Sequence, residues 1–119
     1  MLETMLIVED EPIIAFGLED ILLSNGCGRV LLATHVDEAM HLVRTEPIKG
    51  AVLDVNIHGE RSYPIAIELQ RRSVPFIFAT GYGDAEHPLE FADVPTVTKP
   101  YSGIAIRDAL AFAMKPNQS

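Results

Sequence analysis

The chain has 119 residues, of which 48% are hydrophobic and 22% are charged, and its formal net charge is -8. This length suits one domain with one core, and the composition is that of a globular protein rather than a disordered or fibrous one. The negative charge disfavours binding to nucleic acid or to an anionic membrane surface, because both require a basic field. The single cysteine, Cys27, excludes a disulfide framework and a thiolate metal cluster.

Short apolar runs and helical patterns alternate along the chain. The pattern over 12–25 has Asp10 at the expected N-cap and Gly26 at the C-terminal stop. In chain order we expect strands at 5–8, 30–33, 51–53, 76–79 and 96–98, and helices at 12–25, 36–45, 63–72 and 104–114. Because the runs do not alternate between apolar and polar residues, the strands are expected to be covered on both faces.

This order of elements predicts a doubly wound α/β fold with a five-stranded parallel sheet. The region 81–95 breaks the alternation, since it carries two glycines and two prolines and only 85–92 could be helical. We expect the fourth helix, which belongs there, to be short, distorted or absent.

No apolar run approaches the roughly 20 residues that span a bilayer, and the first residues lack the pattern of a secretory signal. We therefore expect a cytoplasmic protein. No linker or repeat is visible, so residues 1–119 are expected to form a single domain without an output domain.

Polar side chains follow four of the five predicted strands. Ligands of an open α/β sheet bind beyond the carboxyl ends of its strands, so these side chains are candidates for one site. The second strand delivers only Thr34 and His35, as expected if it lies at the sheet edge in the order 2-1-3-4-5. The other four strands are followed by Glu9 and Asp10, by Asp54, by Thr80 and by Lys99.

Three acids close together, beside one lysine, would raise at least one carboxylate pKa unless a divalent cation relieved the repulsion. A site of oxygen ligands suits Mg²⁺ better than zinc. A carboxylate can also accept a phosphoryl group, and Asp54 is the best-placed nucleophile. Lys99 would then pair with the phosphoryl group, and the Thr80 hydroxyl would bond another of its oxygens.

The motifs IVEDEP, AVLDVN, FIFATGYGD and TVTKP, in this order, resemble the receiver domain of bacterial two-component response regulators. The resemblance covers nearly the whole chain and supports the strand order 2-1-3-4-5. It implies that Asp54 is the phosphoacceptor, with Thr80 and Lys99 around the phosphoryl group. It also implies that Asp54, Asp10, the backbone carbonyl of Asn56 and, through water, Glu9 hold Mg²⁺. The phosphoryl donor would be a phosphohistidine on a sensor histidine kinase or a phosphotransfer protein.

Two departures from the family pattern concern its switch. Thr96 stands three residues before Lys99, where the family usually carries an aromatic residue whose rotation reports phosphorylation, and 81–95 replaces a regular fourth helix. With the string Phe-Ala-Thr-Gly-Tyr ending at Tyr82, the chain resembles the FATGUY-like receiver subgroup, often paired with kinases of the HWE or a related class. We expect Thr80 to move towards the phosphoryl group while 81–95, including Tyr82, becomes ordered.

Three other functions are compatible with parts of this pattern. A phosphatase with an aspartate nucleophile needs an acid two residues after it, and Asn56 stands there. A flavodoxin-like module needs a phosphate loop after the first strand, where this chain carries acids that repel phosphate. A pseudo-receiver would bind partners without phosphorylation.

The expected function is therefore that of a stand-alone receiver rather than an enzyme. It would signal by protein contact or act as a phosphate sink. The four histidines, His35, His41, His58 and His87, are interpreted as surface residues.

Overall fold

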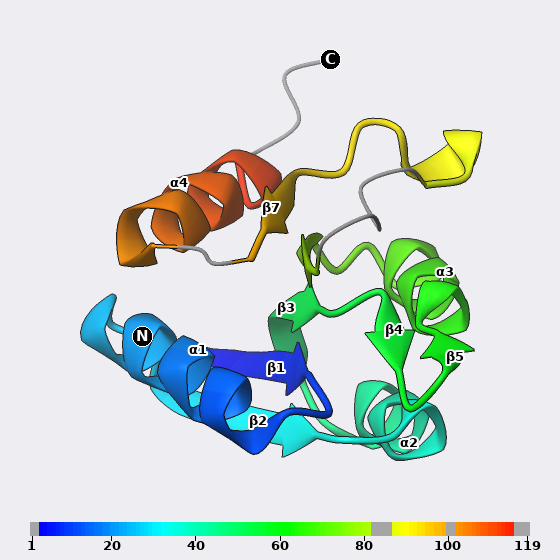
Figure 1. Cartoon of the computed structure of the whole chain (residues 1–119), viewed down its shortest axis with the longest axis horizontal. Coiled ribbons are helices and arrows are strands. Elements are labelled where there is room, and N and C mark those ends of the chain that lie inside the picture. Colours follow the sequence, from blue (N-terminus) through cyan, green and yellow to red (C-terminus); the bar gives the residue numbers. More distant parts are fainter. Residues whose placement is uncertain (1–2, 82–86, 100–101, 116–119) are drawn as a thin grey trace.

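A parallel sheet of five strands forms the centre of the computed structural model, which describes residues 3–81, 87–99 and 102–115 (Figure 1). The strand order is β2-β1-β3-β6-β7, which confirms the predicted doubly wound α/β fold and its order 2-1-3-4-5. The strands of this sheet are Thr4–Val8 (β1), Arg29–Ala33 (β2), Ile48–Leu53 (β3), Phe76–Thr80 (β6) and Thr96–Thr98 (β7).

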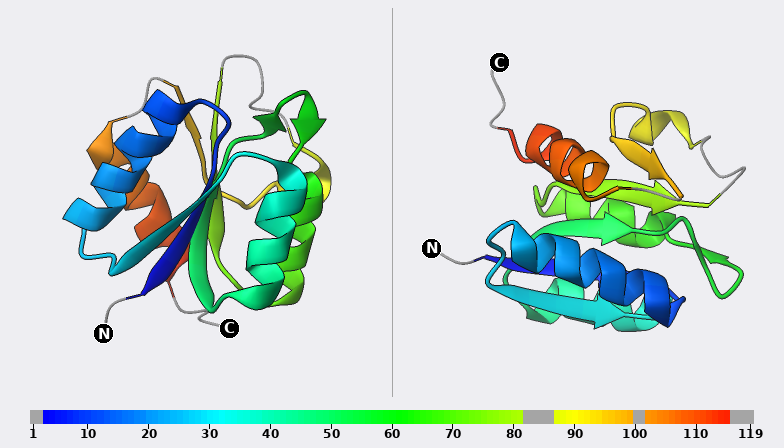
Figure 2. Two further views of the ribbon diagram at one scale, coloured as in Figure 1. Left: turned by 90° about the horizontal axis from the view of Figure 1, so that it is seen from below. Right: turned by 60° about the vertical axis from the view of Figure 1, so that its left-hand side comes forward.

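Four α-helices cover the two faces of the sheet in pairs, as Figure 2 shows. Helices α1 and α4 contact each other on one face, and α2 and α3 contact each other on the opposite face. The helices are Pro12–Ser24 (α1), Val36–Thr45 (α2), Tyr63–Arg71 (α3) and Gly103–Ala113 (α4). Among the residues that the structure describes, no helix is long and apolar enough to cross a membrane.

Both faces of the central strands are buried, which explains their uninterrupted apolar sequences. On β1, Leu6 and Val8 belong to the core under α2 and α3, whereas Met5 and Ile7 belong to the core under α1 and α4. Successive side chains of a strand point to opposite faces, so a strand between two helical layers needs apolar residues at every position.

The region of the expected fourth helix contains one 3₁₀ turn, Leu89–Phe91 (η1), in the part that the structure describes. The Phe91 side chain is completely buried, and its ring lies 5.4 Å from Tyr63 and 5.8 Å from Phe78 between ring centroids. One aromatic side chain therefore covers sheet surface beside α3 that a regular helix would otherwise cover. This confirms the expectation of a short or distorted element.

A two-stranded hairpin, absent from the sequence prediction, separates β3 from α3. Its strands are Asn56–Ile57 (β4) and Glu60–Arg61 (β5), and they pair antiparallel. The two turn residues, His58 and Gly59, have φ values of 51° and 82°, which is the backbone geometry of a tight type I′ hairpin turn. Ile57, three residues after Asp54, is buried in the core under α2 and α3 and fixes the hairpin to the domain.

Candidate functional site

The ends of the parallel strands fix the backbone of the predicted site. Beyond the end of β3, the amide of Asp54 donates to the carbonyl of Val8 at 2.9 Å. Beyond β7, the amide of Lys99 donates to the carbonyl of Thr80 at 2.8 Å. The hydrogen bonding of the sheet thus continues by one residue at both places. The backbones of Asp54 and Lys99 are therefore fixed by the sheet.

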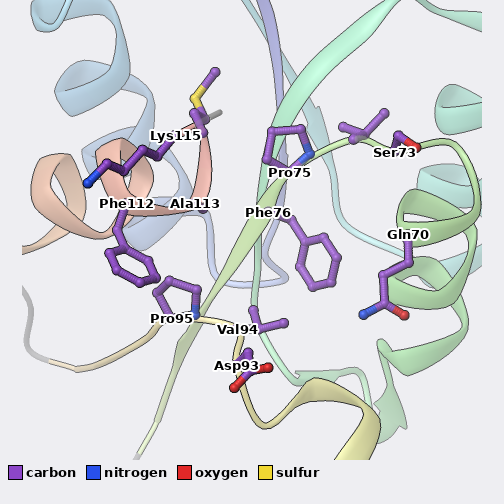
Figure 3. A pocket seen from close by; sticks show the side chains of 12 residues that line it. Gln70, Ser73, Pro75, Phe76, Asp93, Val94, Pro95, Phe112, Ala113 and Lys115 are labelled. Carbon is purple, nitrogen blue, oxygen red and sulfur yellow. The ribbon is translucent and has the colours of Figure 1, made fainter. Parts of the chain in front are cut away.

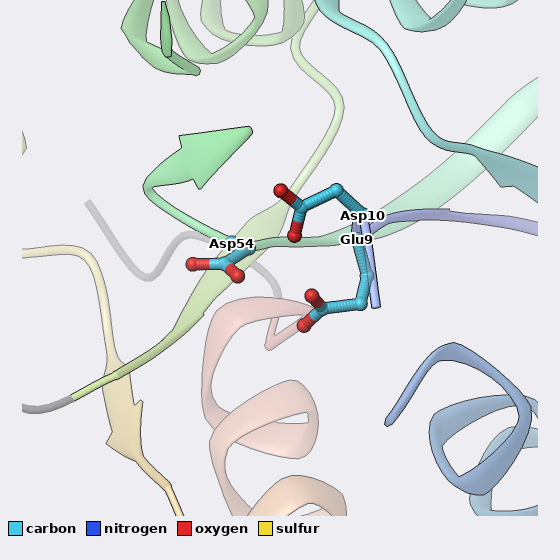
Figure 4. A group of neighbouring side chains, drawn as sticks. All are labelled: Glu9, Asp10 and Asp54. Carbon is cyan, nitrogen blue, oxygen red and sulfur yellow. The ribbon is translucent and has the colours of Figure 1, made fainter. Parts of the chain in front are cut away.

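Three acidic side chains meet at this edge, as Figure 4 shows. Glu9, Asp10 and Asp54 each contribute a carboxylate oxygen, and these oxygens all lie within 4.8 Å of one another. Glu9 is 1% exposed and Asp54 is 5% exposed, so two of the three carboxylates are removed from water. A compact set of oxygen ligands with this charge suits Mg²⁺, which prefers carboxylate, carbonyl and water ligands.

Lys99 is the positive group of the site. Its Nζ donates to Asp54 Oδ2 at 3.1 Å, and it lies 3.3 Å from Glu9 Oε1 and 3.5 Å from Glu11 Oε1. Burial lowers the pKa of Lys99, but the attraction of Asp54 and Glu9 together outweighs it and raises the pKa above its ordinary value. Lys99 therefore remains charged at every physiological pH and offers an ammonium group beside the Asp54 carboxylate.

Glu9 is the most buried acid of the cluster. Burial and then the charge of Asp54 raise its pKa from 4.5 to about 7. Its Oε2 accepts from the amide of Glu11 at 3.1 Å, and its Oε1 pairs with Lys99 Nζ at 3.3 Å. One lysine thus leaves the three acids with excess negative charge, and the raised pKa expected of such a cluster falls on Glu9. This excess charge fits a divalent cation.

Asp10 is held by the hairpin and does not cap α1. The N-cap position belongs to Glu11, and no side-chain bond caps the helix, so the predicted capping role of Asp10 is wrong. Its Oδ2 instead accepts the amide of His58 at 2.9 Å, and the His58 ring stacks on His35 with 4.5 Å between centroids. The turn after Asp54 therefore orients a second acid of the cluster.

The remaining predicted metal and switch residues have mixed outcomes. The amide of Asn56 lies 3.4 Å from Asp54 Oδ1 and donates to it, while the role of its carbonyl stays a prediction. Thr96 is half-buried on β7. Tyr82 lies outside the described residues, so the prediction that it takes part in a switch has no structural counterpart here.

His87 contradicts the prediction that all four histidines lie on the surface. It is half-buried, and its ring lies 4.3 Å from the ring of Phe78. Its Nδ1 is 3.0 Å from the Tyr63 hydroxyl, and its Nε2 is 2.9 Å from the Thr96 hydroxyl. Nothing in the local sequence pattern indicates this position, because each contact comes from a different element of the fold.

Thr80 carries a buried hydroxyl without a partner among the described residues. The side chain is completely buried at the end of β6, next to the strand that leads to Lys99. An unsatisfied buried hydroxyl costs about 1–3 kcal/mol. The hydroxyl is therefore available to an incoming hydrogen-bond acceptor.

Replacing this threonine by valine, Thr80→Val, is expected not to destabilise the protein and to raise the free energy of unfolding by up to about 1 kcal/mol. The valine keeps the branched shape and removes only the unpaired hydroxyl. Urea unfolding measures the effect. In the matched control Thr45→Val, which removes a hydroxyl that donates to the carbonyl of His41 at 2.9 Å, stability should fall. A loss in Thr80→Val as large as in the control would show that the Thr80 hydroxyl is already satisfied.

The pocket in Figure 3 has a volume of about 480 Å³ and lies away from the acids. Pro75 and Phe76 line it at the start of β6, with Pro95 before β7 and Phe112 near the end of α4. These are the amino ends of the strands, whereas the acids lie beyond the carboxyl ends. The pocket is therefore separate from the candidate site.

Comparison with known proteins gives one consistent result. The family model described as the response regulator receiver domain matches residues 5–111. No curated protein matches the chain.

Solved structures resemble the chain over almost its whole length. The solution structure of SdrG from Sphingomonas melonis Fr1 is 40% identical, with a TM-score of 0.86, over 96% of this chain and 98% of that chain. The BeF3-activated conformation of SdrG from Pseudomonas melonis Fr1 is 40% identical, with a TM-score of 0.78, over 94% and 96%.

A more distant similarity concerns the receiver domain of the sensor histidine kinase PA1611 from Pseudomonas aeruginosa PAO1. That structure has a magnesium ion coordinated in its active site cleft. It is 23% identical, with a TM-score of 0.81, over 96% of this chain and 98% of that chain, which shows a shared fold.

Proposed function

Because the chain belongs to the family of response regulator receiver domains, we propose that it accepts a phosphoryl group on Asp54 in a reaction that requires Mg²⁺. The observation that carries this proposal is the hydrogen bond from Lys99 Nζ to Asp54 Oδ2 within the cluster of three acids. An ammonium group on the acceptor carboxylate can also pair with the oxygens of an arriving phosphoryl group.

In the proposed reaction, an Oδ atom of Asp54 forms a bond to phosphorus while the bond between phosphorus and the donor breaks. The leaving group keeps the electron pair of that bond, and it is the imidazole nitrogen when the donor is a phosphohistidine. Lys99 offsets the charge on the phosphoryl oxygens, and the unpaired hydroxyl of Thr80 donates to one of them.

The residues present fit a magnesium ion. Asp10 and Asp54 would hold it through carboxylate oxygens, Asn56 through its carbonyl, and Glu9 through water. When bound, the cation supplies positive charge that neutralises the phosphoryl oxygens and the acids around them. The presence of three acids beside one lysine supports this assignment, as does the raised pKa of Glu9, which reflects its burial and the nearby charge of Asp54.

The partners follow from the same proposal. The donor would be a sensor histidine kinase of the HWE or a related class, or a phosphotransfer protein, acting in the cytoplasm. The phosphorylated receiver would signal by protein contact or act as a phosphate sink. The similarity to SdrG, which has a solved BeF3-activated conformation, supports a receiver that responds to a phosphoryl group.

The test is the intact mass of the protein after incubation with acetyl phosphate. With Mg²⁺ present, we expect the mass to increase by one phosphoryl group, and with excess EDTA we expect no increase. Hydroxylamine should remove the added group, because it cleaves acyl phosphates. A protein that binds Mg²⁺ and never gains mass would contradict the proposal and would favour a receiver that acts without phosphorylation.

A further inference from the structure

His87 connects helix α3 to strand β7. Its Nδ1 contacts the hydroxyl of Tyr63, the first residue of α3, at 3.0 Å, and its Nε2 contacts the hydroxyl of Thr96, the first residue of β7, at 2.9 Å. Between these bonds the imidazole lies against Phe78 of β6 at 4.3 Å, with a tilt of 32°. Three elements therefore meet at one half-buried side chain.

Each ring nitrogen of His87 has a hydroxyl group within hydrogen-bond distance. The Thr96 hydroxyl also lies 3.4 Å from the carbonyl of Val94. A neutral imidazole, with one donor and one acceptor nitrogen, satisfies both bonds at once.

The connection lies close to the groups that would meet the phosphoryl group. In the β6–β7 register Phe78 pairs with Thr96 and Thr80 pairs with Thr98, and Lys99 follows directly. Phe78 and Thr80 also share one face of the sheet, because they are two residues apart on a strand. A movement of the β6 end that carries Thr80 therefore disturbs the packing of Phe78 against His87.

The other end of the connection leads back to Asp54. Tyr63 follows Ser62, whose amide donates to the carbonyl of Val55 at 2.9 Å, and Val55 is the residue after Asp54. The path from the acceptor carboxylate through α3 to β7 thus consists of direct bonds between neighbouring groups. In the structure these bonds exist while the Thr80 hydroxyl still lacks a partner among the described residues.

We propose that His87 is a positioning residue that ties α3 to β7 in the resting receiver and opposes the rearrangement by which Thr80 reaches a phosphoryl group. This inference rests on the proposed function. The ring is bonded on both sides when Thr80 is unpaired, so the connection stabilises the resting arrangement. A ligand that favours the other arrangement must overcome it, and weakening the connection raises the apparent affinity for that ligand.

The experiment measures the affinity of the full chain for beryllofluoride with Mg²⁺, by titration of backbone amide NMR signals. Thr96→Val, which removes the hydroxyl and keeps the shape, and Tyr63→Phe should each bind beryllofluoride about 3- to 10-fold more tightly, as loss of one hydrogen bond implies. Thr96→Ser keeps the hydroxyl and should retain the parent affinity. Thr98→Val, the same change at an exposed position of the same strand, is the control and should have no effect.

Two further readouts separate this role from a merely structural one. The imidazole nitrogen signals of His87 should shift in Thr96→Val, because Nε2 loses its hydroxyl partner. The double variant with Tyr63→Phe should gain less affinity than the product of the two single gains, because both substitutions act through one ring.

The outcomes are distinct. Equal or weaker binding by Thr96→Val and Tyr63→Phe, in a parent that binds beryllofluoride, would overturn the role of His87 and leave the proposed function standing. Absence of beryllofluoride binding by the parent would overturn the proposed function and this inference with it.

Discussion

Asp54→Asn is expected to abolish covalent phosphorylation by acetyl phosphate completely. The asparagine amide keeps the size of the carboxylate but is not a nucleophile, and it lacks the negative charge that pairs with Lys99 Nζ at 3.1 Å. Glu9 and Asp10 are not expected to accept the phosphoryl group in its place. Glu9 is 1% exposed, and Asp10 already accepts the amide of His58. Intact mass measures the loss.

The matched control is Asp37→Asn, which makes the same change at an exposed position in the first turn of α2. This variant should gain one phosphoryl group as the parent does. Circular dichroism should show that Asp54→Asn remains folded, because Lys99 keeps a second carboxylate, that of Glu9, at 3.3 Å. A mass gain that persists in Asp54→Asn would mean that another residue is the acceptor.

The positions of Asp54, Thr80 and Lys99 could be predicted because these residues lie at or just beyond strand ends. Asp54, Thr80 and Lys99 each end or follow an apolar run, and parallel strands bring such residues to one edge whatever the surrounding side chains are. The glycines and prolines of 81–95 predicted the weak fourth helix. The strand order rested in part on the resemblance to receiver domains.

The surroundings of the site could not be predicted, because they depend on contacts between distant segments. The partner of Asp10 is the amide of His58, 48 residues away, and the partner of His87 is Tyr63, 24 residues away. The hairpin turn did have a local signal in Gly59, because a two-residue turn of this type favours a residue that adopts positive φ. No comparable local signal marks His87, since its environment exists only after α3, β6 and β7 have packed.

Without metal, the buried carboxylate of Glu9 is expected to make the stability of the protein depend on pH. Its pKa is about 7 in the folded protein and 4.5 in the unfolded chain, because burial and Asp54 oppose its charge. Below about pH 4.5 both states are protonated, so Glu9 makes no pH-dependent contribution. As the pH rises from there to about 7, the unfolded chain releases the proton and the folded protein keeps it, so stability falls. At 1.36 kcal/mol per pKa unit, the total is about 3 kcal/mol.

Glu9→Gln is therefore expected to stabilise the protein in EDTA at about pH 8, by about 1–3 kcal/mol, and to have little effect at about pH 5. The amide is neutral at both pH values, so the variant avoids the cost of an ionised buried carboxylate. Urea unfolding at the two pH values measures the difference. Glu60→Gln, at an exposed position of β5, should show no such pH-dependent gain.

Magnesium should reverse the order of stability. A cation at the acid cluster favours the ionised form of Glu9, so its binding to the parent releases a proton below about pH 7 and strengthens as the pH rises. The folded parent then gains stability through binding, by RT ln(1 + [Mg²⁺]/Kd), whereas Glu9→Gln binds the cation more weakly and gains less. Thermal unfolding at about pH 8, with and without saturating Mg²⁺, compares the two proteins. If Glu9→Gln gained as much from Mg²⁺ as the parent, the buried carboxylate would have no part in holding the metal, and its raised pKa would reflect burial alone.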